Sequence, residues 1–272
     1  MGLQITRART HIGAIITTET FHQKFVSSSV DIEKLINNFA TRSFRDTADM
    51  DYIAARLSFR VSLVEQFHWQ SLQAVEKYLK AILLYNRIKA PKIGHSLSKA
   101  LNKARGLPFS LELSEIANEF IRHIDAYGRF RYLESSYFIR GPMLVKLDRT
   151  AWEIRRYCKV LNYDITLDDG RKKNMLPVEL DAIRRSENLP PMQFEIPGGA
   201  LEEIVQKKHH PARAPLIWQN GFFGKSKRKT VKARNSFQFK NSPLFLHPEI
   251  VDAVREYVYL PKEIIDACSS RS

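Results

Sequence analysis

Residues 57–82 read LSFRVSLVEQFHWQSLQAVEKYLKAI, and this stretch decides the fold. Its apolar residues and one histidine recur at intervals of three and four, which is the spacing of one face of an α-helix. The spacing predicts one continuous amphipathic helix over 57–82 with this face buried. The positions are Leu57, Val61, Val64, His68, Leu72, Val75, Leu79 and Ile82.

Three further amphipathic helices are expected downstream. The first begins at the Gly94-His95-Ser96 sequence, because a serine before an apolar run caps a helix N-terminus. The second covers about 113–124 and the third about 144–161. In the third, the basic residues lie off the apolar stripe. These off-stripe residues are Arg149, Arg155, Arg156 and Lys159. Four helices with short connections predict an antiparallel bundle.

The chain divides into three parts, and the fold class is expected to be mainly α. The helical domain at 51–163 is expected to hold an antiparallel bundle of four to five helices. Residues 1–50 are expected to form a less regular N-terminal segment, and residues 164–272 a C-terminal extension rich in turn formers. Short elements are expected as strands at 12–18 and 21–27 and as helices at about 178–187 and 248–257.

The positive charge is concentrated in one part of the chain. The formal net charge is +14, yet residues 204–248 contain no acidic residue and are interspersed with aromatic side chains. This combination predicts binding to RNA or another polyanion. A solvated basic loop or a surface for an acidic protein partner is the alternative. The strongest candidates for nucleic-acid contact are Lys225, Lys227, Arg228, Lys229, Lys232 and Arg234.

Several other classes of protein are excluded by the sequence. No run of about 18 uncharged apolar residues is present, so a membrane-spanning helix is not expected. Without a secretory signal the expected compartment is the cytoplasm. Cys158 and Cys268 are too few for a disulfide framework or a cysteine zinc site. No metal site or cofactor is expected, since glycine-rich phosphate loops and zinc-binding or hydrolase motifs are missing.

Four short motifs, in this order, resemble the HEPN (higher eukaryotes and prokaryotes nucleotide-binding) family. The resemblance covers about residues 50–162. It implies a helical, homodimeric protein that binds nucleotide or RNA, or cleaves RNA without metal, in a bacterial defence or toxin–antitoxin-like system with an antitoxin-like partner. The motifs are Ala55-Arg56, the QAVEKYLKA run at 73–81, the GHSL run at 94–97 and Arg131-Tyr132.

The nuclease motif of that family is broken in this sequence. In the family's ribonucleases an arginine is followed, after about four to six residues, by a histidine that moves a proton while the arginine neutralises the phosphorane. Counted from Arg131, the histidine position holds Ser, Tyr or Phe at 136–138. The resemblance therefore implies a silent binding protein or a ribonuclease that uses Arg131 with Tyr137 or His123. A non-catalytic protein-interaction module is a third possibility.

Two further groups of residues have alternative interpretations. Glu76 either faces the Arg131 cleft, as the resemblance implies, or forms an exposed ion pair with Lys80 four residues later. Arg129 and Arg131 form an anion site if they share a face, and are solvated surface charges if they do not. His68 is expected in the core, and His95 is expected to cap or pack.

Overall fold

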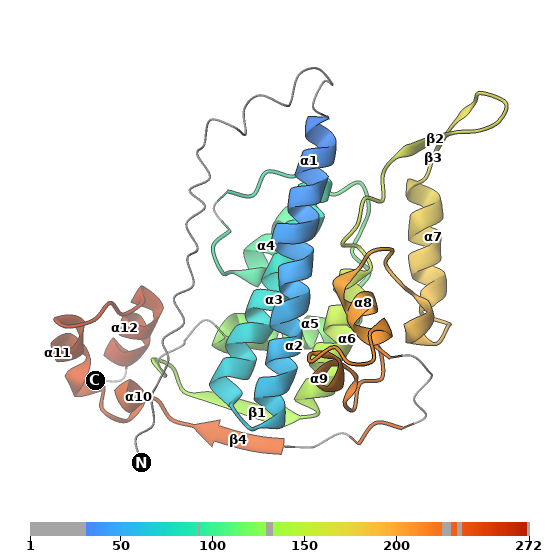
Figure 1. The fold of residues 1–272 in the computed structure, drawn as a ribbon. Coiled ribbons are helices and arrows are strands. Elements are labelled where there is room, and N and C mark those ends of the chain that lie inside the picture. The colour runs from blue at the N-terminus through green and yellow to red at the C-terminus, as the bar shows by residue number, and fades with distance from the viewer. Residues whose placement is uncertain (1–30, 92, 129–132, 225–229, 233–235, 271–272) are drawn as a thin grey trace, which may run out of the picture.

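The computed structural model describes residues 31–91, 93–128, 133–224, 230–232 and 236–270 (Figure 1). The protein is mainly helical, as the sequence predicts. The expected strands at 12–18 and 21–27 lie outside the described residues. The first half of the described chain contains α1 (Ile32–Phe39), a π-helical segment (Ala40–Arg45), α2 (Asp46–Arg60), α3 (Val64–Tyr85), α4 (Leu97–Ala104), α5 (Glu115–Tyr127) and α6 (Met143–Arg155).

The helical domain begins earlier than the sequence predicts. Helix α1, the π-helical segment and α2 follow one another without interruption from Ile32 to Arg60, so the expected boundary at residue 50 falls inside a helix. The Asp31 side chain caps this helix by accepting the N–H of Lys34 at 3.2 Å. Residues 31–50 contain neither glycine nor proline, so nothing in them breaks the helix.

The predicted continuous helix over 57–82 is wrong, because the chain turns back at residues 61–63. Ser62 adopts a left-handed conformation with φ of 63°, and the Leu63 N–H bonds to the Ser58 carbonyl at 2.8 Å. Two helices, α2 and α3, result and pack side by side (Figure 1). Val61 belongs to the periodic stripe but is 63% exposed at this turn. The turn contains no glycine or proline, which is why the periodicity alone conceals it.

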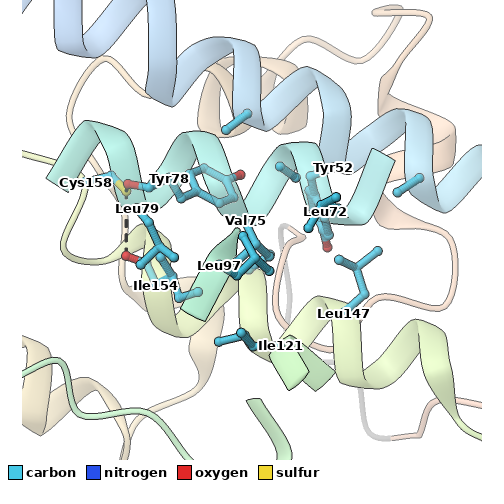
Figure 2. Close-up of a cluster of buried hydrophobic side chains, with 14 of the residues drawn as sticks. Tyr52, Leu72, Val75, Tyr78, Leu79, Leu97, Ile121, Leu147, Ile154 and Cys158 are labelled. Carbon is cyan, nitrogen blue, oxygen red and sulfur yellow. Dashed lines mark hydrogen bonds between the residues drawn. The ribbon is translucent and has the colours of Figure 1, made fainter. Parts of the chain in front are cut away.

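Helix α3 is the centre of the bundle and packs against α2, α4, α5 and α6. Ser96 and Ser114 cap α4 and α5 by accepting backbone N–H groups, each at 3.3 Å. The helices expected at 94–104, 113–124 and 144–161 correspond to α4, α5 and α6, although α6 ends at Arg155, six residues before the expected end. Each fully buried aliphatic side chain contributes roughly 1.5–3 kcal/mol. Figure 2 shows this core, which includes Leu72, Val75, Leu79, Leu97, Ile121, Leu147 and Ile154.

The segment after α6 covers one side of the bundle through buried arginines. Arg155 is 3% exposed and binds both carboxylate oxygens of Asp49, at 2.8 and 2.9 Å. It also binds Glu202 of the covering segment at 2.7 Å. Arg155, which lies off the apolar stripe of its helix, is therefore buried by a second layer of chain packed on the bundle. That layer contains α7 (Leu176–Ser186), the 3₁₀ turn Pro191–Gln193, α8 (Ala200–Gln206) and α9 (Arg213–Ile217).

Two small antiparallel sheets, which the sequence does not predict, complete the described structure. Strand β1 (Tyr137–Gly141) pairs with β4 (Ser236–Lys240), and β2 (Asp164–Thr166) pairs with β3 (Lys172–Asn174). Strand β1 lies between α5 and α6, so β4 joins the distant basic segment to the helical domain.

The last helices form a small unit with its own apolar cluster (Figure 1). The expected helix at 248–257 corresponds to a 3₁₀ turn and α11, and the helix expected at 178–187 corresponds to α7. No helix in the described part of the chain is long and apolar enough to cross a membrane. The elements of the unit are α10 (Pro243–Leu246), the 3₁₀ turn Pro248–Ile250, α11 (Val251–Arg255) and α12 (Lys262–Ser269).

Candidate nucleic-acid interface

The β1–β4 sheet presents aromatic and basic side chains on its outer face. Along β1, Tyr137 and Ile139 are buried while Phe138 and Arg140 are exposed, because alternate side chains of a strand point to opposite faces. The register sets Phe138 opposite Phe239 and Arg140 opposite Phe237. Directly opposite residues share a face. The outer face, which we call the aromatic platform, consists of Phe138, Arg140, Phe237 and Phe239.

A pocket of about 400 Å³ adjoins the platform between α5 and α6. Phe138 and Arg140 of the platform line it on one side, and His123 of α5 and Lys146 of α6 line it on the other. The Lys146 ammonium pairs with Glu119 at 2.9 Å, so this cation is partly neutralised. The pocket therefore extends the platform toward His123, one of the sequence candidates.

Tyr137 lies on the inner face of β1, beside His68. The ring stands at 88° to the ring of His68, with centroids 5.5 Å apart. The Glu65 carboxylate, which accepts from Lys240 of β4 at 2.6 Å, lies on the same side. Burial and this carboxylate raise the pKa of Tyr137 above its ordinary value. Tyr137 therefore stays protonated and does not act as a base.

His123 of α5 faces His68 of α3, with their Nε2 atoms 3.0 Å apart. Burial lowers the pKa of His68 to about 3, and burial together with the charge of Lys146 lowers the pKa of His123 to about 4. Both imidazoles are therefore neutral at pH 7, and one donates its N–H to the other. His68 is a core residue, as expected, and it contacts both Tyr137 and His123.

Gly128 fixes the distance between α5 and α3 at this histidine pair. A Cβ atom at Gly128 would lie 2.6 Å from the carbonyl oxygen of Ile124 in α5 itself, 2.9 Å from that of His68 and 3.0 Å from the Cβ of Leu72. These distances are too short for any side chain. The glycine therefore allows the end of α5 to rest on the α3 backbone, which brings His123 to His68.

Glu76 belongs to a separate group about 12 Å along α3, since it lies eight residues after His68. The expected ion pair with Lys80 is present at 2.5 Å, but Glu76 is only 3% exposed. Its second oxygen contacts Nδ1 of His95 at 2.8 Å. Ser96, not His95, provides the helix cap. Sequence reasoning missed the Glu76–His95 pair, although both residues belong to the motifs that carry the family resemblance.

The remaining candidates are placed as follows. Lys232 is exposed, and its backbone N–H donates to Gln219 at 3.0 Å. No three metal-ligating side chains come together among the residues that the structure describes. Seven candidates fall outside the described residues, and they are Arg129, Arg131, Lys225, Lys227, Arg228, Lys229 and Arg234.

The described arrangement therefore unites Tyr137 and His123 around His68 and sets Glu76 and Lys80 apart from them. Chemically, the exposed aromatic rings can stack with bases and the cations can neutralise phosphates. A family model described as HEPN domain matches residues 41–161, from the π-helical segment through α6. Neither a curated protein nor a solved structure matches the chain. Residues 41–161 of this chain are a HEPN domain.

Proposed function

We propose that this protein binds RNA or nucleotide as a divergent HEPN-domain protein that lacks the nuclease histidine. A HEPN domain points to a function connected with nucleotides, RNA or nuclease chemistry. The observation that carries the proposal is the pairing of β4 with β1 along all five residues of each strand. Strand β4 belongs to the acid-free segment 204–248, and β1 begins at Tyr137 of the HEPN domain.

The charge of this segment supplies the binding energy that the proposal requires. Phosphate neutralisation by lysine and arginine releases counterions, so affinity for a single strand falls with salt by a slope of about 0.7 per phosphate contact. Without a carboxylate between Glu203 and Glu249, the segment has no internal charge that competes for its cations. A steep dependence on salt is therefore expected.

Purified protein incubated in EDTA with a mixed pool of single- and double-stranded RNA tests this function. Both bound RNA and fragment length are read, and Arg131→Ala is assayed beside the wild type. Binding without cleavage is the expected result. If no RNA binds at low salt and an acidic protein co-purifies instead, the protein is an interaction module and the proposal is wrong.

An active metal-independent endoribonuclease is the second candidate function, with Arg131 acting together with Tyr137 or His123. The contacts of both side chains with His68 favour it. Cleavage in EDTA that disappears in Arg131→Ala supports this candidate, and separate His123→Gln and Tyr137→Phe variants show which of the two side chains acts with Arg131.

We also propose that the protein acts as a homodimer in a bacterial defence or toxin–antitoxin-like system, as the family resemblance implies. Apolar side chains on the exposed surface of α1 are available for a contact between copies. These are Ile32, Leu35 and Phe39. Light scattering after gel filtration is expected to give twice the chain mass of 31.5 kDa. A mass equal to one chain at all concentrations would contradict the dimer.

A further inference from the structure

We propose that the aromatic platform stacks the bases of an unpaired strand, so that the ligand of this protein is single-stranded RNA. This inference rests on the proposed RNA-binding function and specifies its substrate class. It concerns the outer face of the β1–β4 sheet, opposite the inner face that carries Tyr137.

The platform consists of rings that the fold leaves in solvent. Phe237 is 72% exposed, Phe239 is 55% exposed and Phe138 is 39% exposed. Phe138 also packs against the rings of Tyr127 and His123, with centroids 5.5 and 5.8 Å away. The two more exposed rings, Phe237 and Phe239, bury little apolar area and therefore give the fold little. Contiguous exposed apolar surface of this kind marks a binding site.

The register brings these rings close enough for one strand of nucleic acid to contact them together. Phe138 and Phe239 are directly opposite each other, which sets their Cβ atoms about 4.5–5.5 Å apart. Phe237 lies two residues further along β4 on the same face, opposite Arg140. Three rings and one guanidinium thus share one face of the sheet, and their chemistry suits base stacking and phosphate contact.

The charges around the platform are complementary to a polyanion. Strands β1 and β4 contain Arg140 and Lys240 and no acidic residue. Two carboxylates beside the sheet are already paired, Glu65 with Lys240 and Glu119 with Lys146. The strand β4 is itself part of the acid-free segment. A negatively charged ligand is therefore favoured over a neutral apolar one.

The exposed rings favour a single strand over a duplex. In double-stranded RNA the bases are stacked on one another and their faces are covered, so a protein ring cannot stack on them. Unpaired bases offer both faces, and aromatic stacking is a major source of affinity in proteins that bind single strands. A duplex would contact the cations alone.

The test compares a platform variant with a matched surface variant. Phe237→Ser with Phe239→Ser removes two exposed platform rings, and Tyr257→Ser with Tyr259→Ser removes two rings that are 83% and 86% exposed in the C-terminal unit. Affinities of both variants and the wild type are measured by fluorescence anisotropy for a labelled single strand and for the matching duplex RNA, across a salt series. Unchanged thermal unfolding confirms that each variant is folded.

The platform variant is expected to bind the single strand at least about tenfold more weakly, since stacking is worth about 1–3 kcal/mol per base. Its duplex affinity and its salt slope should equal those of the wild type, and the tyrosine variant should behave as the wild type throughout. If the platform variant loses equal affinity for single strand and duplex, or if it binds the single strand as tightly as a wild type that binds RNA, the inference is overturned and the proposed function remains intact. A wild type that binds no RNA would overturn the proposed function as well.

Discussion

Two regions of the molecule combine arginine with phenylalanine in opposite environments. One is the interface between α6 and the segment that covers it, and the other is the outer face of the β1–β4 sheet. Arg155 is buried, binds Asp49 and Glu202, and lies 6.0 Å from the ring centroid of Phe223. Arg140 is exposed beside Phe237 and forms no ion pair with any residue that the structure describes. The same residue types thus stabilise the fold where their partners are internal, and remain available to a ligand where they are not.

The largest effect is expected at the buried arginine. Arg155→Met leaves the carboxylates of Asp49 and Glu202 without their cation, which costs about 3–5 kcal/mol of unfolding free energy when a buried pair is broken. Urea unfolding measures this loss. Arg185→Met is the matched control, because Arg185 is exposed and its partner in the described structure is Asp181, at 3.1 Å; it should change stability by less than about 0.5 kcal/mol. Similar losses in both variants would remove the distinction between buried and exposed arginines.

The close approach of α5 and α3 predicts the next largest effect. Gly128→Ala forces a methyl group against the carbonyls of Ile124 and His68 and should cost about 1–3 kcal/mol, the range for overpacked sites. The control is Gly106→Ala, where the nearest atom to an added Cβ is the Lys103 carbonyl oxygen at 3.4 Å. Equal melting temperatures for the two variants would show that α5 does not need this glycine.

The buried histidine pair predicts a dependence of stability on pH. The pKa values of His68 and His123 are about 3 and about 4 in the folded protein, below the ordinary value of 6.5. Between the folded pKa values and 6.5, the unfolded chain binds more protons than the folded protein. The free energy of unfolding therefore falls as pH decreases from 6.5 toward 4, by at most about 1.4 kcal/mol per pH unit for each histidine. At higher pH the full stability is retained.

Urea unfolding at several pH values between about 7.5 and 5 checks this expectation. His123→Gln should lose less stability on acidification than the wild type, because one buried titrating group has been removed. The exposed His247→Gln variant should follow the wild type. An identical pH dependence in all three proteins would mean that the pair does not govern acid sensitivity.

The smallest effect on stability is expected on the platform. Phe237→Ser and Phe239→Ser should each change the unfolding free energy by less than about 0.5 kcal/mol, because neither ring is buried. Thermal unfolding measures it. A loss comparable to that of Gly128→Ala would mean that the rings support the fold, and it would weaken the contrast with the buried interface.

The helical core was predictable from sequence, since the periodicity of α3 to α6 is the direct result of burying one face of each helix. The break at Ser62 was not, because a non-glycine residue in a left-handed turn leaves no signal in the apolar spacing. Arg155 and Asp49 lie more than a hundred positions apart, so their pairing depends on tertiary structure.

The candidate site was only partly predictable. His123 and Tyr137 could be identified by their separation from Arg131 along the sequence. Their common contact with His68 depends on the packing of α3, α5 and β1. The pairing of β4 with β1 joins segments a hundred residues apart and required the structure. The aromatic residues of the basic segment were recognised, but not which of them share a face.

The salt dependence of RNA affinity tests the central claim most directly. The wild type is compared with a variant in which Lys225, Lys227, Arg228 and Lys229 are all replaced by alanine, and affinity for single-stranded RNA is plotted against salt on logarithmic axes. Each lost phosphate contact should reduce the slope by about 0.7, so up to about 3 in total, with unfolding unchanged. A wild-type affinity that does not vary with salt, or a variant with the same slope as the wild type, would contradict the claim that the basic segment binds RNA.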